Sequence, residues 1–217
     1  MAVGVSLPTF RQAALSEFKQ LPEGIPTGNG SVFLIKRFDR GPDDQRIHME
    51  NLAQVLDRPP EEPQYGGRYE HVAAVLAALA PTDVRAFCER LVFCVLCGNT
   101  DAHLKNWSLL YPDGRHPQLS PAYDLVASVL YAPRLIPDEL ALSLGGSRRF
   151  EDVRLDSFRL LAEVSHLSFD VVASWVREAT GRVREAWARE ATHLPWLDSE
   201  RQRINEHLMR IPLVQGR

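Results

Sequence analysis

The feature of this sequence that most constrains its fold is a helix so apolar that only the middle of a domain can bury it. Between residues 84 and 97, apolar side chains recur every three or four positions, which is the spacing of one helix face. That face consists of Val84, Phe87, Cys88, Leu91 and Val95. The last turns are apolar on every side, because they add Val92, Phe93, Cys94 and Leu96. We therefore expect a buried central helix that runs directly into the polar loop 98–106.

The rest of the chain predicts a helix-dominated α+β fold with one small sheet or hairpin. Residues 31–35 have the composition of a buried strand, and residues 107–111 and 118–119 flank a strong turn, as in a β-hairpin. Helical patterns cover residues 9–18, 47–56, 71–79, 155–164, 168–187 and 198–209. We expect about six helices and no internal repeat.

Composition excludes several classes of protein. The chain has 217 residues, 45% of them hydrophobic, and a net charge of −3 from 25 basic and 28 acidic side chains. This balance gives no general attraction for nucleic acid. The longest apolar run, Leu91 to Cys97, is too short to span a bilayer, and residues 1–10 show no secretory signal. Three cysteines form no even disulfide framework, so we expect reduced thiols in a cytoplasmic globular protein.

The polar residues that can carry chemistry are Asp101, Asn106 and Asp124, with the predicted hairpin between the second and the third. Phosphoryl transfer from ATP needs oxygen-bearing side chains in this kind of order. One carboxylate accepts the proton of the attacking hydroxyl, while an amide oxygen and a second carboxylate hold Mg²⁺ on the phosphates. The five-residue spacing allows the loop to fold back, so that Asp101 and Asn106 face one cleft. Lys105, in the same loop, is placed to neutralise charge on the transferred group.

These residues also resemble a known family. The segments Gly98 to Ser108 (GNTDAHLKNWS) and Leu119 to Asp124 (LSPAYD) are similar to the HipA-like serine/threonine kinases. Those proteins are toxins of bacterial toxin–antitoxin modules, with a fold related to that of protein kinases. Residues 35–40 (IKRFDR) resemble the strand-to-hinge segment of the family. The resemblance covers residues 31–130 well and the helical C-terminus loosely, and it separates the chain from antibiotic phosphotransferases, whose catalytic loop opens with a His-Gly-Asp pattern.

The resemblance implies a role for each polar residue of the loop. Asp101 would be the catalytic base, and Lys105 would assist at the phosphates. Asn106 and Asp124 would be the Mg²⁺ ligands. The alternative for these side chains is loop capping and turn hydrogen bonds. His103 is expected to pack and bond within its loop, the alternative being that it orients Asp101.

The same resemblance implies a nucleotide site and two kinds of partner. The backbone around Lys36, Arg37 and Phe38 would form the hinge that binds adenine, and Tyr123 would lie under the nucleotide or fill space before Asp124. The phosphate acceptor in the family is typically a protein hydroxyl, and known targets include aminoacyl-tRNA synthetases. The usual regulator is a small DNA-binding antitoxin protein.

The chain departs from the family pattern before the hinge. A kinase of this kind needs a phosphate-covering loop and a lysine on a preceding strand, which the family carries in an N-terminal lobe. Only 30 residues precede Ser31, and we expect them to form a helix and a loop with no strand–glycine-loop–strand pattern. The glycine-rich segment 24–30 is interpreted as a turn. Residues 1–30 are therefore predicted to be a remnant of the upper lobe, and residues 31–217 the C-terminal kinase lobe.

Three hypotheses follow from this departure. The missing lobe is a separate subunit, or the gene is a truncated remnant, or the chain is a catalytically dead module that binds an antitoxin-like partner. Losing the phosphate clamp would lower the rate by orders of magnitude. A small-molecule phosphotransferase on a related fold is a further alternative. Cys94 and Cys97 have the spacing of a redox or zinc pair, but their place in the apolar helix favours core packing.

Overall fold

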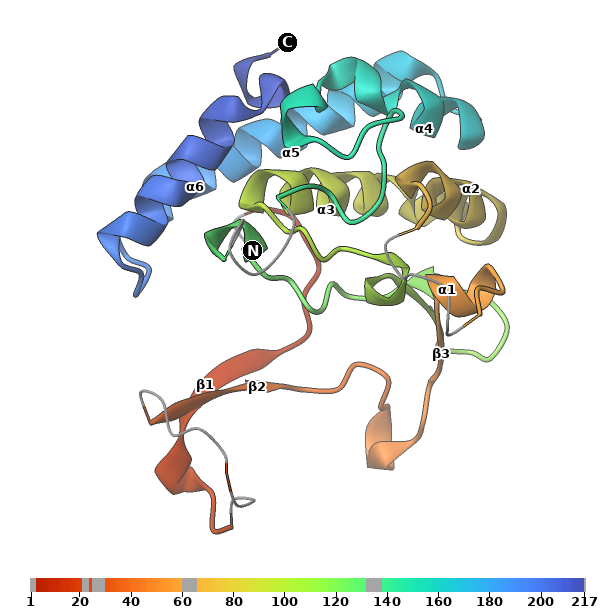
Figure 1. Ribbon diagram of the computed structural model, residues 1–217. Coiled ribbons are helices and arrows are strands. Elements are labelled where there is room, and N and C mark those ends of the chain that lie inside the picture. Colours follow the sequence, from red (N-terminus) through yellow and green to blue (C-terminus); the bar gives the residue numbers. More distant parts are fainter. Residues whose placement is uncertain (1–2, 21–23, 25–29, 60–65, 132–137, 217) are drawn as a thin grey trace.

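Figure 1 shows the computed structural model of the chain, a layered helical body with a two-stranded ribbon extending away from it. It describes residues 3–20, 24, 30–59, 66–131 and 138–216. The outer layer consists of α4 (Arg159–Val164), α5 (Phe169–Glu190) and α6 (Asp198–Arg210). The layer beneath consists of α2 (Tyr69–Leu79) and α3 (Val84–Cys97), and α1 (Leu52–Val55) lies below it beside the small sheet. Within the described residues, no helix has the length and apolar character needed to cross a membrane.

Helix α3 is the buried central helix that the apolar pattern predicts. The side chains of Phe87, Leu91 and Val95 have no exposed surface, and α3 packs against the long helix α5. The helix ends at Gly98, which has a φ of 71°. A Cβ at this position would lie 2.3 Å from Cγ2 of Val129, so both the left-handed backbone and the close approach require glycine.

The strands form two small antiparallel sheets. In the ribbon, β1 (Phe10–Ala14) pairs with β2 (Ser31–Ile35), with Phe10 opposite Ile35. The second sheet has the order β3 (His48–Asn51), β4 (Ser108–Tyr111), β5 (Gln118–Leu119). The positions of the predicted strand 31–35 and of the predicted hairpin are therefore confirmed, as is the helix-dominated α+β class. The strand is not buried as expected, because it pairs with β1 in a two-stranded sheet and leaves Phe33 and Ile35 61% and 46% exposed. Short 3-10 helices occur at Leu15–Glu17, Pro42–Asp44, Pro81–Asp83, Leu104–Asn106, Ser128–Leu130, Phe150–Asp152, Leu155–Phe158 and Pro212–Gln215.

The helix expected over residues 9–18 is wrong. This stretch is β1 followed by one 3-10 turn, Leu15–Glu17. The strand obtains its hydrogen-bond partners from β2, and the pairing continues where the Lys36 N–H donates to the Thr9 carbonyl at 2.8 Å. A helical period over so few residues is a weak signal, and pairing with a distant strand overrides it. A strand therefore does precede the glycine-rich segment, although residues 25–29 of that segment lie outside the described residues.

The expected helix from Ile47 is also only partly right. His48–Asn51 is strand β3, paired with β4, and the helix begins at Leu52. Asn51 ends the strand and caps the helix, because its Oδ1 accepts the Gln54 N–H at 3.0 Å while Oε1 of Gln54 accepts the Asn51 N–H at 2.9 Å. This reciprocal capping box places the start of the helix at Leu52, five residues later than the apolar pattern predicts.

Candidate active site

The loop that follows α3 is held against the helix end by backbone hydrogen bonds. The N–H of Asn99 donates to the Cys94 carbonyl at 2.9 Å, and the N–H of Gly98 donates to the Val95 carbonyl at 3.3 Å. These two bonds form the Schellman arrangement that commonly ends a helix at glycine. Oδ1 of Asn99 then accepts the Asp101 N–H at 2.9 Å. Asp101 is thereby placed just beyond the buried end of α3, with its side chain partly exposed.

Asp101 and Asn106 lie next to each other, as the five-residue spacing predicts. The Nδ2 group of Asn106 donates to the backbone carbonyl of Asp101 at 2.8 Å. Because a carbonyl can only accept, the atom facing it must be the amide nitrogen. The oxygen of the same amide therefore points away from this bond and is the atom suited to a hard cation. The loop also closes through the Asn106 N–H, which donates to the His103 carbonyl at 2.9 Å.

Two buried aromatic side chains hold this loop against the core. Nε1 of Trp107 and the hydroxyl of Tyr69 both donate to the Ala102 carbonyl, at 3.1 and 3.2 Å. Both side chains are buried, and burial raises the pKa of Tyr69, so its hydroxyl remains a donor. The Ala102 carbonyl thus has two donors, and the residue next to Asp101 is fixed to the core.

His103 contacts the loop and also approaches Asp101. It is buried, and its Nε2 lies 3.7 Å from Oδ1 of Asp101. That distance is too long for a hydrogen bond but short enough for charge attraction if the ring is protonated. The ring is therefore buried within its own loop, as expected, and it also lies close to Asp101, as the alternative proposes.

Tyr123 joins the segment that carries Asp124 to the Asp101 loop. Its hydroxyl donates to the Lys105 carbonyl at 2.7 Å and lies 2.5 Å from Oγ of Ser108. Since the tyrosine proton is used on the carbonyl, the serine must be the donor of the second bond. Burial raises the pKa of Tyr123, which keeps the hydroxyl protonated for this role.

Asp124 itself has an unusual backbone. Its φ is 55°, in the left-handed region that few residues other than glycine adopt, and its side chain is exposed. Aspartate tolerates this region better than most side chains, yet such positions are maintained only when the surroundings hold them, and they concentrate at functional sites. Asp124 is therefore an exposed carboxylate on a left-handed backbone, directly after Tyr123.

The predicted hinge residues lie beside the same tyrosine. The ring of Phe38 is 5.5 Å from that of Tyr123, centroid to centroid. Lys36 has an exposed side chain, and its backbone N–H is already used by Thr9. The guanidinium of Arg37 binds Asp39 through two hydrogen bonds of 2.8 and 2.6 Å and lowers the pKa of that carboxyl to about 2. Residues 37–38 are therefore the part of the predicted hinge that lies beyond the pairing with β1.

Sequence reasoning missed Arg90, a buried cation beneath the site. Only 3% of Arg90 is exposed, and its Nη2 donates to the Ser120 carbonyl. The guanidinium also lies over the Trp107 ring, 5.5 Å from its centroid, and burial lowers its pKa to about 10. The signal that could have revealed it is its position: Arg90 directly precedes the apolar run Leu91 to Cys97, next to the apolar face of α3. Arg90 ties the central helix to the segment that leads to Asp124.

The residues around the site are better suited to a metal ion bound through oxygen atoms than to one bound through thiolates. Burial raises the pKa of Cys94 to about 12, consistent with core packing of that thiol. The described residues contain no group of three or more histidine, cysteine, aspartate or glutamate side chains arranged to hold a metal ion. The predicted Mg²⁺ ligands are a different set, an amide oxygen of Asn106 and the carboxylate of Asp124, and oxygen donors of this kind fit Mg²⁺.

Comparison with known proteins decides the family. A family described as the HipA-like C-terminal domain matches residues 3–188. The chain belongs to this family. The HipA-like resemblance expected from residues 98–108 and 119–124 is therefore confirmed. The match also includes residues 3–30, the part of the chain that contains strand β1.

Curated relatives of this HipA-like chain carry kinase names. "Putative kinase Y4dM" of Sinorhizobium fredii is 36% identical over 214 residues, which is 98% of this chain and 52% of the relative. "Putative kinase Y4mE" of the same organism is 32% identical over 206 residues, covering 88% of this chain and 48% of the relative. The chain thus spans about half the length of the curated relatives that it matches.

Solved structures show the same fold at low identity. HipA of Shewanella oneidensis, in a complex with HipB and operator DNA, matches 99% of this chain and 52% of its own with a TM-score of 0.72 and 18% identity. The Helicobacter pylori proinflammatory kinase CtkA matches 99% of this chain and 75% of its own with a TM-score of 0.53 and 12% identity. The fold of the HipA-like chain is therefore kinase-like.

Proposed function

We propose that this HipA-like domain transfers the γ-phosphate of ATP to a serine or threonine hydroxyl of a protein. The observation that carries the proposal is the bond from Nδ2 of Asn106 to the Asp101 carbonyl. It turns the amide oxygen of Asn106 outward beside Asp101. Tyr123 braces the segment of Asp124 against the same loop. Two acids and an amide oxygen on braced segments are the groups that phosphoryl transfer needs.

Each residue then has a definite task. Asp101 accepts the proton of the substrate hydroxyl. The hydroxyl oxygen forms a bond to the γ-phosphorus of ATP, and the bond between that phosphorus and the β,γ-bridging oxygen breaks, so that ADP leaves. Asn106 and Asp124 would hold Mg²⁺, which neutralises phosphate charge when bound. Lys105, whose side chain is exposed, stabilises negative charge on the transferred group.

The nucleotide base would lie near Phe38 and Tyr123. The backbone of Arg37 and Phe38 offers hydrogen-bonding groups to adenine, because the Lys36 N–H is used by Thr9. The two aromatic rings provide an apolar surface at the same place. ATP is therefore the nucleotide that we propose, with the adenine at this hinge.

We propose that a further lobe completes the phosphate clamp by docking on the ribbon, either as a separate subunit or as part of a longer chain. The ribbon presents Phe10, Phe33 and Ile35, which are 52%, 61% and 46% exposed, on one face. An isolated two-stranded ribbon is marginally stable, so strands that extend it and cover this face would stabilise it. Residues 1–30 and 31–217 remain the proposed division between the lobes. Residues before the ribbon contact the body, since the Ala122 N–H donates to the Ser6 carbonyl at 2.8 Å.

The partners are proposed on family grounds. The Shewanella HipA structure contains the antitoxin HipB, and we propose an antitoxin protein as the regulator of this chain. A cytoplasmic protein, for example an aminoacyl-tRNA synthetase, is proposed as the phosphate acceptor. If no further lobe supplies the phosphate clamp, the alternative proposal is a catalytically dead module that binds the antitoxin.

Calorimetric titration of the chain with ATP, with and without Mg²⁺, tests the proposal. We expect heat of binding that depends on Mg²⁺ in the wild type and loses that dependence in Asp124→Asn. Asp101→Asn should bind Mg·ATP but transfer no radiolabelled phosphate to protein. Asp170→Asn, on the exposed first turn of α5, is the matched control and should behave as the wild type. No heat at millimolar Mg·ATP would instead support the dead binding module.

A further inference from the structure

Helix α6 contacts the segment before Asp101 and the segment after Asp124, the two carboxylates of the proposed site. It is the last α-helix of the described chain, and it lies beyond residues 3–188 that the family matches. Two of its side chains, Arg203 and His207, are one helical turn apart and so lie on the same face. Each donates a hydrogen bond to a backbone carbonyl of one of the two segments.

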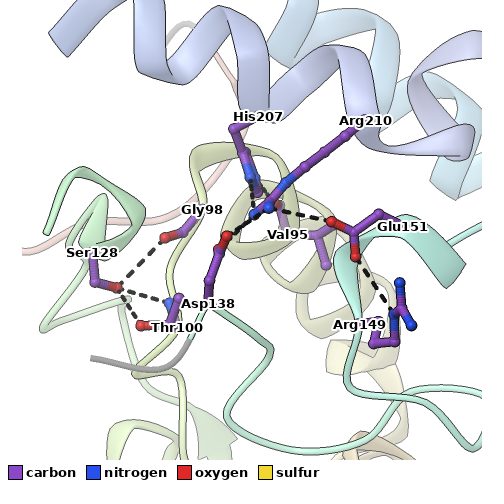
Figure 2. A network of polar contacts seen from close by, with 9 residues as sticks. All are labelled: Val95, Gly98, Thr100, Ser128, Asp138, Arg149, Glu151, His207 and Arg210. Carbon is purple, nitrogen blue, oxygen red and sulfur yellow. Dashed lines mark hydrogen bonds and ion pairs between the residues drawn. The ribbon is translucent and has the colours of Figure 1, made fainter. Parts of the chain in front are cut away.

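The first of these contacts is made by His207 at the end of α3. Its Nε2 lies 2.8 Å from the Val95 carbonyl, and its Nδ1 lies 3.1 Å from Nη2 of Arg210, as Figure 2 shows. The carbonyl can only accept and the guanidinium can only donate, so the ring must be neutral with its proton on Nε2. Only 3% of His207 is exposed. The Val95 carbonyl is three residues before Gly98, in the turn from which the Asp101 loop emerges.

The second contact is made by Arg203 at the 3-10 turn Ser128–Leu130. Nη1 of Arg203 donates to the Leu130 carbonyl at 2.6 Å. This turn begins four residues after Asp124. The bond is exposed, so its strength is lower than that of the buried histidine bond.

The two segments also bind each other between these contacts. The N–H of Thr100 donates to Oγ of Ser128 at 2.7 Å, and the N–H of Val129 donates to the Gly98 carbonyl at 3.0 Å. Figure 2 shows Ser128 pointing at both Thr100 and Gly98. The segment before Asp101 and the segment after Asp124 are therefore in direct contact, and α6 holds each of them from the same side.

The base of α6 is itself anchored. Arg210 forms two hydrogen bonds of 2.6 Å with the Asp138 carboxylate and an ion pair of 3.2 Å with Glu151. The ring of Phe150 packs edge-on against His207, with centroids 4.6 Å apart. A helix fixed at this end transmits its position to the groups that it holds.

From these contacts we infer that α6 is a positioning element of the proposed phosphotransfer site, with Arg203 and His207 as positioning residues. The inference rests on the proposed function. Through Val95 the histidine sets the start of the Asp101 loop, and through Leu130 the arginine sets the turn after Asp124. Removing either contact loosens the relative placement of the two acids without touching nucleotide or substrate.

The matched pair for the arginine is Arg203→Ala and Arg201→Ala. Both residues are on α6 and both donate to backbone carbonyls, but Arg201 binds Ala191 and Leu194 in the α5–α6 connection. For the histidine, His207→Gln retains a donor near Val95 and His207→Ala does not. Two readouts are used for each variant, the Mg²⁺ dependence of ATP binding by calorimetry and hydrogen exchange of the Thr100 and Val129 amides.

We expect Arg203→Ala and His207→Ala to weaken the Mg²⁺-dependent part of ATP binding by about tenfold, because misplacement of a ligand by a fraction of an ångström is costly. Exchange of the Thr100 and Val129 amides should accelerate in the same variants. Arg201→Ala should leave both readouts at wild-type values, and His207→Gln should recover most of the loss.

The two possible failures are distinct. If the wild type binds Mg·ATP but Arg203→Ala and His207→Ala match Arg201→Ala in both readouts, the inference is overturned and the proposed function stands. If the wild type binds no Mg·ATP, the proposed function is overturned, and with it the catalytic meaning of α6. The inference is supported if the wild type binds Mg·ATP and the Thr100 and Val129 amides exchange faster in Arg203→Ala and His207→Ala than in the wild type.

Discussion

The hydroxyl of Tyr123 donates a hydrogen bond to the backbone carbonyl of Lys105 at 2.7 Å. Seventeen residues, including a β-hairpin, separate these two positions in the chain, yet this bond joins the loop of Asp101 directly to the residue before Asp124. Ser108 donates to the same hydroxyl and completes the joint. One phenol group thus contributes two of the hydrogen bonds that set the separation of Asp101 and Asp124.

Tyr123→Phe removes this joint and keeps the aromatic ring against Phe38. We expect the free energy of unfolding to fall by about 1 kcal/mol, because two hydrogen bonds to a partly buried group are lost. Under the proposed function, phosphate transfer should fall by about tenfold or more, since one of the joints that set the relative position of Asp101 and Asp124 is lost. Chemical denaturation and radiolabel transfer measure the two effects. Tyr131→Phe, at a tyrosine that is 54% exposed, is the control and should change neither quantity.

Gly98→Ala tests the close approach of the α3 end to the segment after Asp124. The new Cβ would lie 2.3 Å from Val129, and the backbone there has a positive φ. Gly114→Ala meets the same backbone penalty at a φ of +75°, with no atom within 4 Å. We expect the control to cost about 1 kcal/mol of unfolding free energy for its left-handed backbone. Gly98→Ala should cost about 1–3 kcal/mol more, because the core must also move. Equal losses in urea denaturation would contradict the packing of Val129 on Gly98.

Asn106→Asp tests which atom of the amide faces Asp101. In the variant an oxygen replaces the donating nitrogen and meets the Asp101 carbonyl, so two acceptors lie 2.8 Å apart. We expect the free energy of unfolding to fall by about 1–3 kcal/mol. Asn205→Asp is the matched control, since Asn205 uses its oxygen to accept the Trp187 Nε1–H and keeps that bond as a carboxylate. A loss no larger than that of the control would place the amide the other way round.

The acid stability of the chain should depend on His207. Burial lowers its pKa to about 4 in the folded protein, while an unfolded histidine titrates near about 6.5. Between these values the unfolded chain takes up a proton that the folded ring does not, so stability falls as the pH falls from about 6.5 to about 4. The full effect is about 3 kcal/mol. Above about pH 6.5 the ring is neutral in both the folded and the unfolded chain, so it does not affect how the free energy of unfolding depends on pH.

Denaturation midpoints measured from pH 7 to pH 4 check this effect. His207→Gln has no titrating ring, so the fall over this window should be reduced in the variant. Arg210 lowers the pKa of the Asp138 carboxyl, so this group adds to the loss of stability from about pH 5 downward, and the two proteins are best compared above that value. An identical slope in both proteins would contradict the buried, neutral state of the ring.

The apolar spacing of residues 84–97 was enough to predict the buried central helix, because complete burial leaves an unambiguous pattern in sequence. The same reasoning failed at residues 10–14, where a few apolar residues fit either a helix or a strand. There the outcome was decided by the hydrogen-bond partners that β2 supplies from about twenty residues away. Hydrogen bonds between distant segments leave no local period, so only the folded chain reveals them.

The candidate site also combines features that the sequence determines with features that only the tertiary structure decides. The order Asp101, Asn106, Asp124 and the turn between the last two were determined by the sequence alone, because residue chemistry and turn propensity are local properties. Tertiary structure decided how these residues are held. Arg90 beneath the loop, Tyr123 across it and His207 behind it each bind a backbone carbonyl of a distant segment. A carbonyl is present at every residue, so nothing in the sequence marks the one that a side chain will find, and only the packing of α3, α6 and the hairpin brings each donor to its acceptor.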